Sequence, residues 1–209
     1  MNITSFFKKP SDKDTKSVWN TMSLSRFVVF IAVVATSFSS VAVENKGEED
    51  SVIQVVTEYM EAYSKSEFDR AATLVHPQHL SDYEQYTLPI LIEAKNDPWS
   101  AKHPIVEVFF EGVPDDKIHK LTGTQVSAYI DRAMVTYLPA ILDSARLENI
   151  SVKSVIFLNE SHARIHYDLS HNGEKSAIEE DFAKHEGEWR ILLPVTPKQA
   201  AEHLQSVFQ

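Results

Sequence analysis

The chain has no cysteine among its 209 residues. Without cysteine there is no disulfide, no thiolate metal ligand and no cysteine nucleophile, so a disulfide-rich scaffold and a cysteine hydrolase are both excluded. Glycine motifs are missing as well, since the sequence contains no P-loop, no Rossmann glycine pattern and no Gly-x-Ser-x-Gly elbow. Nucleotide hydrolysis, dinucleotide redox chemistry and serine hydrolysis therefore have no support in the sequence.

Positive charge is also scarce. The chain has 20 Lys and Arg against 30 Asp and Glu, a net charge of −10. Five of the basic residues lie near the N-terminus, at Lys8, Lys9, Lys13, Lys16 and Arg26, so the remainder is more acidic still. Nucleic acids and anionic membranes are bound through clustered Lys and Arg. We therefore predict no nucleic-acid partner, and no membrane partner once the N-terminal segment is removed.

The N-terminal apolar run, Phe27 to Phe38, is too short for a comfortable membrane span, which takes roughly 20 residues. Arg26 precedes this run, and Ser40-Val41-Ala42 supplies small residues after it. This order is typical of a secretory signal peptide. We predict a signal peptide over residues 1–42, with translation starting at either Met1 or Met22, and export to the periplasm or beyond the cell.

The polar stretch 43–50 is predicted to be a disordered lead-in to a single domain over 51–209. Apolar residues then recur at three- and four-residue steps, which predicts helices from Ser51, over Glu67–Val75 capped by Ser66, over about His79–Ala94 bent by Pro89, and from Thr122. Thr122-x-x-Gln125 matches a capping box, as does Thr196-x-x-Gln199 before a last helix.

From Leu147 the apolar period changes to two, which predicts strands. Ile150, Val152, Ile156 and Leu158 alternate in the first strand. The second contains Ala163 to Leu169, the third Lys175 to Lys184 and the fourth Trp189 to Leu193, with turns at Asn172-Gly173 and Glu186-Gly187. The predicted fold class is α+β: N-terminal helices packed on a bent four-stranded antiparallel sheet, followed by a C-terminal helix.

Three features together resemble the nuclear transport factor 2-like superfamily, in particular its small exported bacterial members of unknown function. They are a helical segment with Asp69, Ala71, Leu74 and His76-Pro77, the late run of four strands, and the closing sequence GEWRILLP over 187–194. The resemblance implies a sheet wrapped around helices to form a cone with an apolar pocket. It makes a homodimer one of the assemblies to expect. The chain departs from the family where a short hairpin follows the second helix, because more helix and a Pro-rich stretch stand there.

The polar residues near the His76-Pro77-Gln78-His79 segment are candidates for binding. With Asp82, the two histidines have donor atoms suited to zinc or copper, but a polar residue at a helix start is the simpler interpretation. Pro77 interrupts the register between the two rings, so we predict no metal site. Tyr83 and Tyr86 are candidates to line a pocket with hydroxyl groups, or else they belong to the core.

Three residues are candidates for acid–base chemistry. His166 and Asp168 share one face of the second strand, where they form either a catalytic pair or part of a solvated surface. Glu180 lies between Ile178 and Phe182, so its carboxylate points toward the apolar face unless a bulge or a sheet edge turns it to solvent.

The sequence predicts an exported, non-catalytic domain that binds a small apolar ligand or a protein partner, without a cofactor. The alternative is an enzyme of the isomerase, dehydratase or hydrolase type that uses Glu180 or the His166/Asp168 pair. Fold alone does not choose between them, because the superfamily contains ketosteroid isomerases and scytalone dehydratase as well as many binding modules.

Overall fold

The computed structural model describes residues 46–137, 139–171 and 174–208, all of them within a contact unit that spans 39–209. The predicted signal peptide and the predicted turn at Asn172-Gly173 lie outside the described residues. No helix in the described ranges is both long enough and apolar enough to cross a membrane.

The first half of the described chain is helical. Its elements are α3 (Lys46–Ser64), α4 (Phe68–Ala72), α5 (Pro77–Asp82), the π-helix η1 (Tyr83–Thr87), α6 (Leu88–Asn96), η2 (Ser100–Lys102), α7 (Pro104–Phe109), η3 (Asp115–Lys120), α8 (Gly123–Tyr137), α9 (Ala140–Ser144) and η4 (Leu147–Asn149). The second half supplies β1 (Ile150–Asn159), β2 (His162–His171), β3 (Glu174–His185), β4 (Glu188–Leu192) and the closing helix α10 (Pro197–Phe208).

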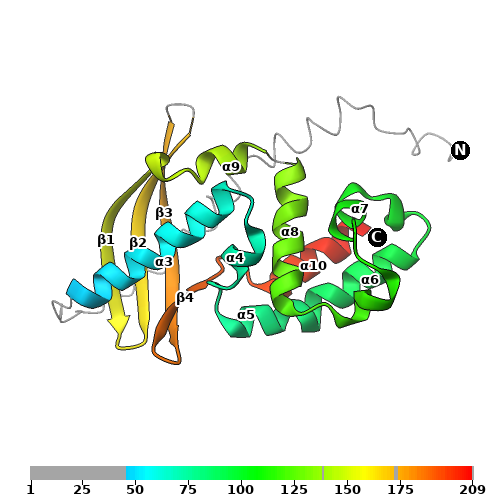
Figure 1. Cartoon of the computed structure of the whole chain (residues 1–209), viewed down its shortest axis with the longest axis horizontal. Coiled ribbons are helices and arrows are strands. Elements are labelled where there is room, and N and C mark those ends of the chain that lie inside the picture. Colours follow the sequence, from blue (N-terminus) through cyan, green and yellow to red (C-terminus); the bar gives the residue numbers. More distant parts are fainter. Residues whose placement is uncertain (1–45, 138, 172–173, 209) are drawn as a thin grey trace, which may run out of the picture. The chain divides into compact units, whose positions relative to one another are not determined.

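The four strands form one antiparallel sheet in the order β1-β2-β3-β4, and α3 lies along one face of it (Figure 1). Apolar residues of α3 share a hydrophobic core with the inward-facing side chains of the sheet. The predicted fold class is confirmed: helices, then an antiparallel four-stranded sheet, then a C-terminal helix.

The predicted alternation along β1 is wrong in its second half. The pairing of β1 with β2 shifts register between Val152 and Ser154, which reverses the faces that later residues occupy. Val155 and Phe157 therefore pack against the core, while Ile156 and Leu158 are 38% and 56% exposed.

Two helix starts also differ from the prediction. α3 begins at Lys46, so residues 46–50 are helical rather than a disordered lead-in. The acidic first turn, with Glu48 and Glu49, suits the positive end of the helix dipole, which the composition of this stretch does not reveal. α4 is shorter than predicted, and Ser66 does not cap it: Ser66 has a φ of 59° and Glu67 occupies the cap position.

The predicted bend at Pro89 takes the form of a π-helix. α5, η1 and α6 follow one another without a break, and the Leu88 N–H donates to the carbonyl of Tyr83, five residues earlier. Pro89 has no N–H to donate, and the wider π-turn lies directly before it. The Pro-rich segment that follows is also helical, with Pro104 opening α7. The described stretch between α4 and α8 is therefore built from helices, with no strand in it.

Both predicted capping boxes form. The Thr122 N–H donates to the Gln125 side chain at 3.0 Å, and the Gln125 N–H donates back to the Thr122 hydroxyl at 3.4 Å. Thr196 and Gln199 make the same pair of bonds at 3.0 and 3.3 Å. The two boxes satisfy backbone donors at the starts of α8 and α10.

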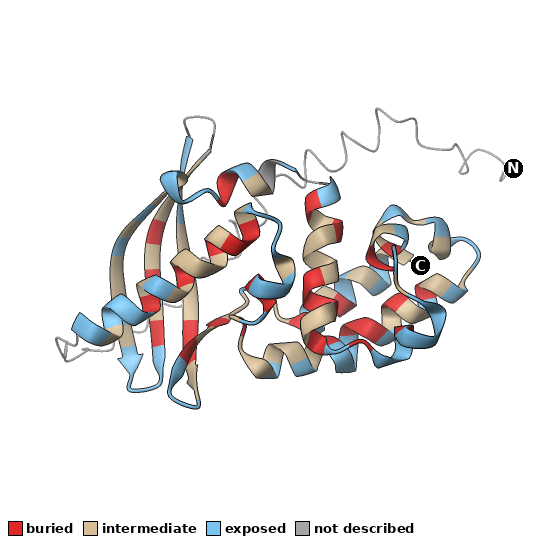
Figure 2. Cartoon of the chain, in the orientation of Figure 1, coloured by how far each residue is buried: buried red, intermediate tan, exposed pale blue. Residues whose placement is uncertain are grey.

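The buried residues form two hydrophobic cores, visible as the red positions in Figure 2. The first lies between α3 and the sheet and includes Ile165 and Phe182. The second lies among α6, α7 and α8 and includes Leu91 and Phe109. Helix α8 contributes to both, with Val135 in the first core and Val126 in the second. The two cores meet along α8.

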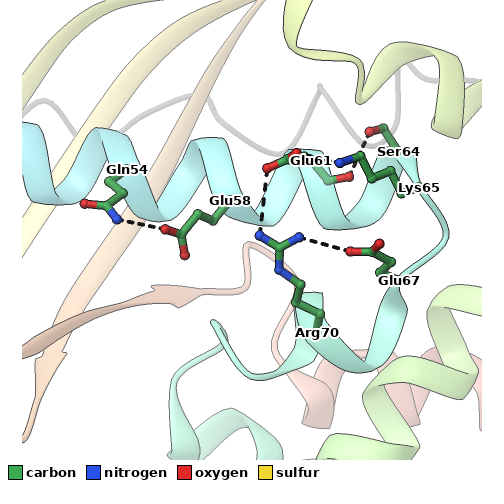
Figure 3. Close-up of polar contacts among 7 residues, drawn as sticks. All are labelled: Gln54, Glu58, Glu61, Ser64, Lys65, Glu67 and Arg70. Atoms are coloured by element: carbon green, nitrogen blue, oxygen red, sulfur yellow. Dashed lines mark hydrogen bonds and ion pairs between the residues drawn. The ribbon is translucent and has the colours of Figure 1, made fainter.

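The outer surface of α3 carries a row of polar contacts (Figure 3). Lys65 pairs with Glu61 at 2.6 Å, and Arg70 of α4 pairs with Glu67 at 3.0 Å and with Glu61 at 3.8 Å. Exposed pairs of this kind contribute about 0–1 kcal/mol each, so they join α3 to α4 without determining the fold.

Candidate functional site

The candidate site is built around Glu180, which lies on the inward face of the sheet. The pairing of β2 with β3 is regular from His162 to His171, and it places Glu180 directly opposite Ile165. Directly opposed residues point to the same side of a sheet, and Ile165 is fully buried. The pairing with β2 runs through Glu180 without a bulge, so the alternative of a bulge is excluded, and β3 begins to pair with β4 at the next residue, Asp181.

One oxygen of Glu180 has no partner. The carboxylate is hydrogen-bonded by the hydroxyl of Tyr167, yet Oε2 is buried and lacks any hydrogen bond in the described part of the chain. A buried polar atom left unsatisfied costs about 1–3 kcal/mol, so natural proteins rarely retain one without a reason.

A second carboxylate, Asp131, faces the same region from α8. It accepts a hydrogen bond from the Tyr63 hydroxyl at 3.5 Å. Tyr63 in turn lies beside Tyr59 on α3, with ring centroids 5.8 Å apart. Tyr59 interacts electrostatically with both Asp131 and Glu180, so it lies near both acidic groups.

We name this group of residues the inner cluster. It consists of two carboxylates and four tyrosines from five elements: Tyr59 and Tyr63 of α3, Tyr83 of η1, Asp131 of α8, Tyr167 of β2 and Glu180 of β3. Tyr83 belongs to the second hydrophobic core, whereas Tyr63 and Tyr167 belong to the first. The inner cluster therefore lies where the two cores meet.

Burial dominates the electrostatics of the inner cluster. It raises the pKa of Glu180 to about 7, against a hydrogen bond from Tyr167 that lowers it. It likewise raises the pKa of Asp131 to about 7, against the hydrogen bond from Tyr63. The pKa values of all four tyrosines are raised, chiefly by burial and further by the nearby carboxylates. The tyrosines remain neutral donors, while each carboxyl group exchanges its proton near neutral pH.

Each of the two acidic residues has a cation close by on its own element, α8 or β3, and both cations have partners elsewhere. Arg132, next to Asp131 in sequence, donates to the carbonyls of Val108, Phe109 and Glu111 at 3.0–3.1 Å and closes the end of α7. Lys184 pairs with Glu48 at 2.8 Å. Neither contributes to the shifts of the two inner carboxyl groups.

The predicted pair His166 and Asp168 shares the outer face of β2, but each residue has a different partner. His166 Nδ1 lies 3.5 Å from Glu179, and Asp168 lies 3.0 Å from Lys153. Glu179 stands directly opposite His166 on β3, and Lys153 is the residue at the register shift of β1. The structure does not bring His166 and Asp168 together as an acid–base pair.

The predicted binding residues His76 and His79 each accept a hydrogen bond from a backbone N–H group through a ring nitrogen. His76 Nδ1 accepts the N–H of Gln78 at 3.2 Å and so caps α5. His79 Nδ1 accepts the N–H of Leu193 at 3.0 Å, which ties α5 to the end of β4. Within the described ranges no three histidine or acidic residues are grouped as a metal site would require.

The two tyrosines predicted as candidates, Tyr83 and Tyr86, lie in different environments. Tyr83 is buried and belongs to the inner cluster, whereas Tyr86 is 36% exposed on the same π-helix.

A hollow of about 320 Å³ occurs elsewhere, between α6 and η3, lined by Ile92, Lys95, Asn96, Asp115, Ile118 and His119. None of these residues belongs to the inner cluster, and Lys95 already pairs with Asp115 at 3.4 Å.

Asp131 is the acidic residue of the site that sequence reasoning missed. The more apolar face of α8 contains Val126, Ile130 and Ala133, and Asp131 lies outside that face. A signal was present: Asp131 stands four residues after Ser127 and four before Val135, and both of these are buried. Residues four apart share a helix face, so Asp131 lies on a second inward stripe.

Comparison of the chain with protein-family models, curated proteins and solved structures finds no match.

Proposed function

We propose that the protein is an exported, non-catalytic domain of the nuclear transport factor 2-like type that binds a small, mostly apolar ligand at the inner cluster. The observation that carries the proposal is the buried Oε2 of Glu180 without a hydrogen-bond partner. A ligand group that donates to this oxygen would recover the 1–3 kcal/mol that the unsatisfied atom costs.

Two further observations support a ligand. Part of the surface of each of three cluster residues stays accessible to solvent: Glu180, Asp131 and Tyr59. Burial is nevertheless the largest cause of the raised pKa of each of them. The surroundings combine the apolar side chains of two cores with a few convergent polar groups, the usual composition of a small-molecule site.

Native mass spectrometry of the chain, purified without denaturation, tests the proposal. We expect extra mass that leaves on collisional activation, and we expect Glu180→Leu to reduce it at least tenfold, because leucine keeps the approximate volume but removes the carboxylate. Glu179→Leu is the matched control, since Glu179 points to the outer face, where it pairs with Arg164 and His166. A bare wild-type protein, or equal retention by Glu180→Leu, contradicts the proposal.

The second candidate function is an enzyme of the isomerase or dehydratase type. It is favoured by the pKa values of about 7 for Glu180 and Asp131, which suit a general acid or base at neutral pH. Incubation of the released ligand with the protein in D₂O separates the two functions. A binding module returns the ligand unchanged, whereas an acid–base enzyme alters it or exchanges its protons, and Glu180→Gln abolishes that change.

A further inference from the structure

The inner cluster combines excess negative charge with aromatic surface. Its two carboxylates come from different elements, β3 and α8. The pKa of each is set by burial, which raises it, and by one hydrogen bond from a tyrosine, which lowers it. In the described part of the chain no lysine or arginine offsets either charge. Nature usually pairs a buried carboxylate with a cation, so the missing partner is itself informative.

Aromatic rings lie beside both of these acidic groups. Tyr59 and Tyr63 lie side by side with their ring planes tilted by 37°, and the Tyr63 hydroxyl contacts Asp131. Tyr83 approaches Asp131 from η1, and Tyr167 contacts Glu180 from the sheet. Aromatic rings beside carboxylates are the recognised environment for organic ammonium groups, because the face of each ring is electronegative.

We propose that the ligand of the inner cluster is an organic cation, a protonated amine with an apolar body. The unpartnered Oε2 of Glu180 would face the positive group, the tyrosine rings would surround it, and the apolar body would contact the adjoining cores. This inference rests on the proposed function, since it names the class of ligand that the same site takes.

The proposal makes the binding pH-dependent in a defined direction. Both carboxyl groups are partly protonated at neutral pH, and a bound cation favours their ionised forms. Binding therefore releases protons, and affinity for the cation rises from pH 5 to pH 8. The groups that face the site are Asp131, Glu180 and the four tyrosines, and the raised pKa values of the tyrosines keep their charge unchanged over this range.

The test uses two probes of the same shape, benzylammonium, which carries N–H donors, and its neutral isostere ethylbenzene. Their dissociation constants are measured by ligand-observed NMR at pH 5 and pH 8, with circular dichroism confirming the fold at both. At pH 8 we expect the cation to bind at least about tenfold more tightly than its neutral isostere. At pH 5 we expect this preference for the cation over the isostere to be smaller. Asp131→Asn and Glu180→Gln should each reduce the preference severalfold, while the outer-face control Glu179→Gln leaves it unchanged.

The outcomes separate the two proposals. Equal binding of both probes, or a preference that the Asp131 and Glu180 variants leave intact, overturns the assignment of a cation while apolar binding stands. If neither probe binds at millimolar concentration, the assignment of a cation and the binding site itself both fail.

Discussion

Among the glycines in the described part of the chain, Gly123, the first residue of α8, is the one that packs closely against another backbone segment. A Cβ atom added there would lie 1.9 Å from the carbonyl oxygen of Leu80 and 2.4 Å from its carbonyl carbon. Both distances are far below any contact that real Cβ atoms make, and the atoms concerned belong to the backbone of α5. We predict that Gly123→Ala strongly destabilises the fold.

The magnitude follows from what would have to move. Leu80 lies in the continuous α5–η1–α6 segment, and the Gly123 N–H also donates to the Glu84 carboxylate from that segment. Neither helix can withdraw without disturbing the other, so the cost falls at the upper end of overpacking, about 3 kcal/mol. For a domain of this size that lowers the melting temperature by about 6–12 °C.

Urea and thermal denaturation, followed by circular dichroism, measure the effect. Gly47→Ala is the matched control, because Gly47 lies in α3 with nothing within 4 Å of an added Cβ. Alanine is the better helix former there, so this variant should gain up to about 1 kcal/mol. If Gly123→Ala is as stable as the wild type within about 0.5 kcal/mol, the close packing of α5 against α8 is wrong.

Two further predictions concern pH. Burial lowers the pKa of His79, whose neutral Nδ1 accepts the Leu193 N–H, while Asp82 acts in the opposite direction, so the stability of the fold should fall as the pH drops below the ordinary histidine value of 6.5. In urea unfolding from pH 7.5 to 5.5, His79→Asn should reduce this dependence of stability on pH, because the amide oxygen of asparagine accepts the bond without titrating. An unchanged pH dependence would refute the reasoning. Hydrogen bonds from Lys184 and then Trp189 lower the pKa of Glu48, so its contribution is present above the ordinary value of 4.5 and is lost as the pH falls below it. The stability difference between wild type and Glu48→Gln should therefore shrink from pH 6 to pH 3, and a constant difference would argue against the contact.

The sequence predicted the order of elements because that order depends on local patterns. Both capping boxes and the turn at Glu186-Gly187, where both residues have positive φ, follow from neighbouring residues alone. The bulge in β1 does not, because a period-two pattern reads equally well with or without one extra residue. The early start of α3 does not follow from neighbouring residues either, because Glu48 accepts a hydrogen bond at 2.6 Å from Trp189, which is 141 residues away in the sequence.

The site was predictable only in part. Glu180 stood out as a charged residue within an apolar alternation, and the structure places it on the inward face. The partners of His166 and Asp168 could not be read from β2 alone, because they depend on the registers with β3 and β1. Asp131 was missed because a helix that contributes to two cores has two inward stripes, and only the more apolar one is conspicuous.

The inner position of Glu180 is the central claim, and a carboxyl ¹³C NMR titration tests it most directly. The Glu180 resonance is assigned by its loss in Glu180→Gln, with Glu179→Gln as the control that leaves it in place. We predict a titration midpoint near pH 7, because burial raises the pKa of this carboxyl to about 7. A midpoint near the ordinary value of 4.5 would place Glu180 in solvent and contradict the inner cluster together with the ligand site built on it.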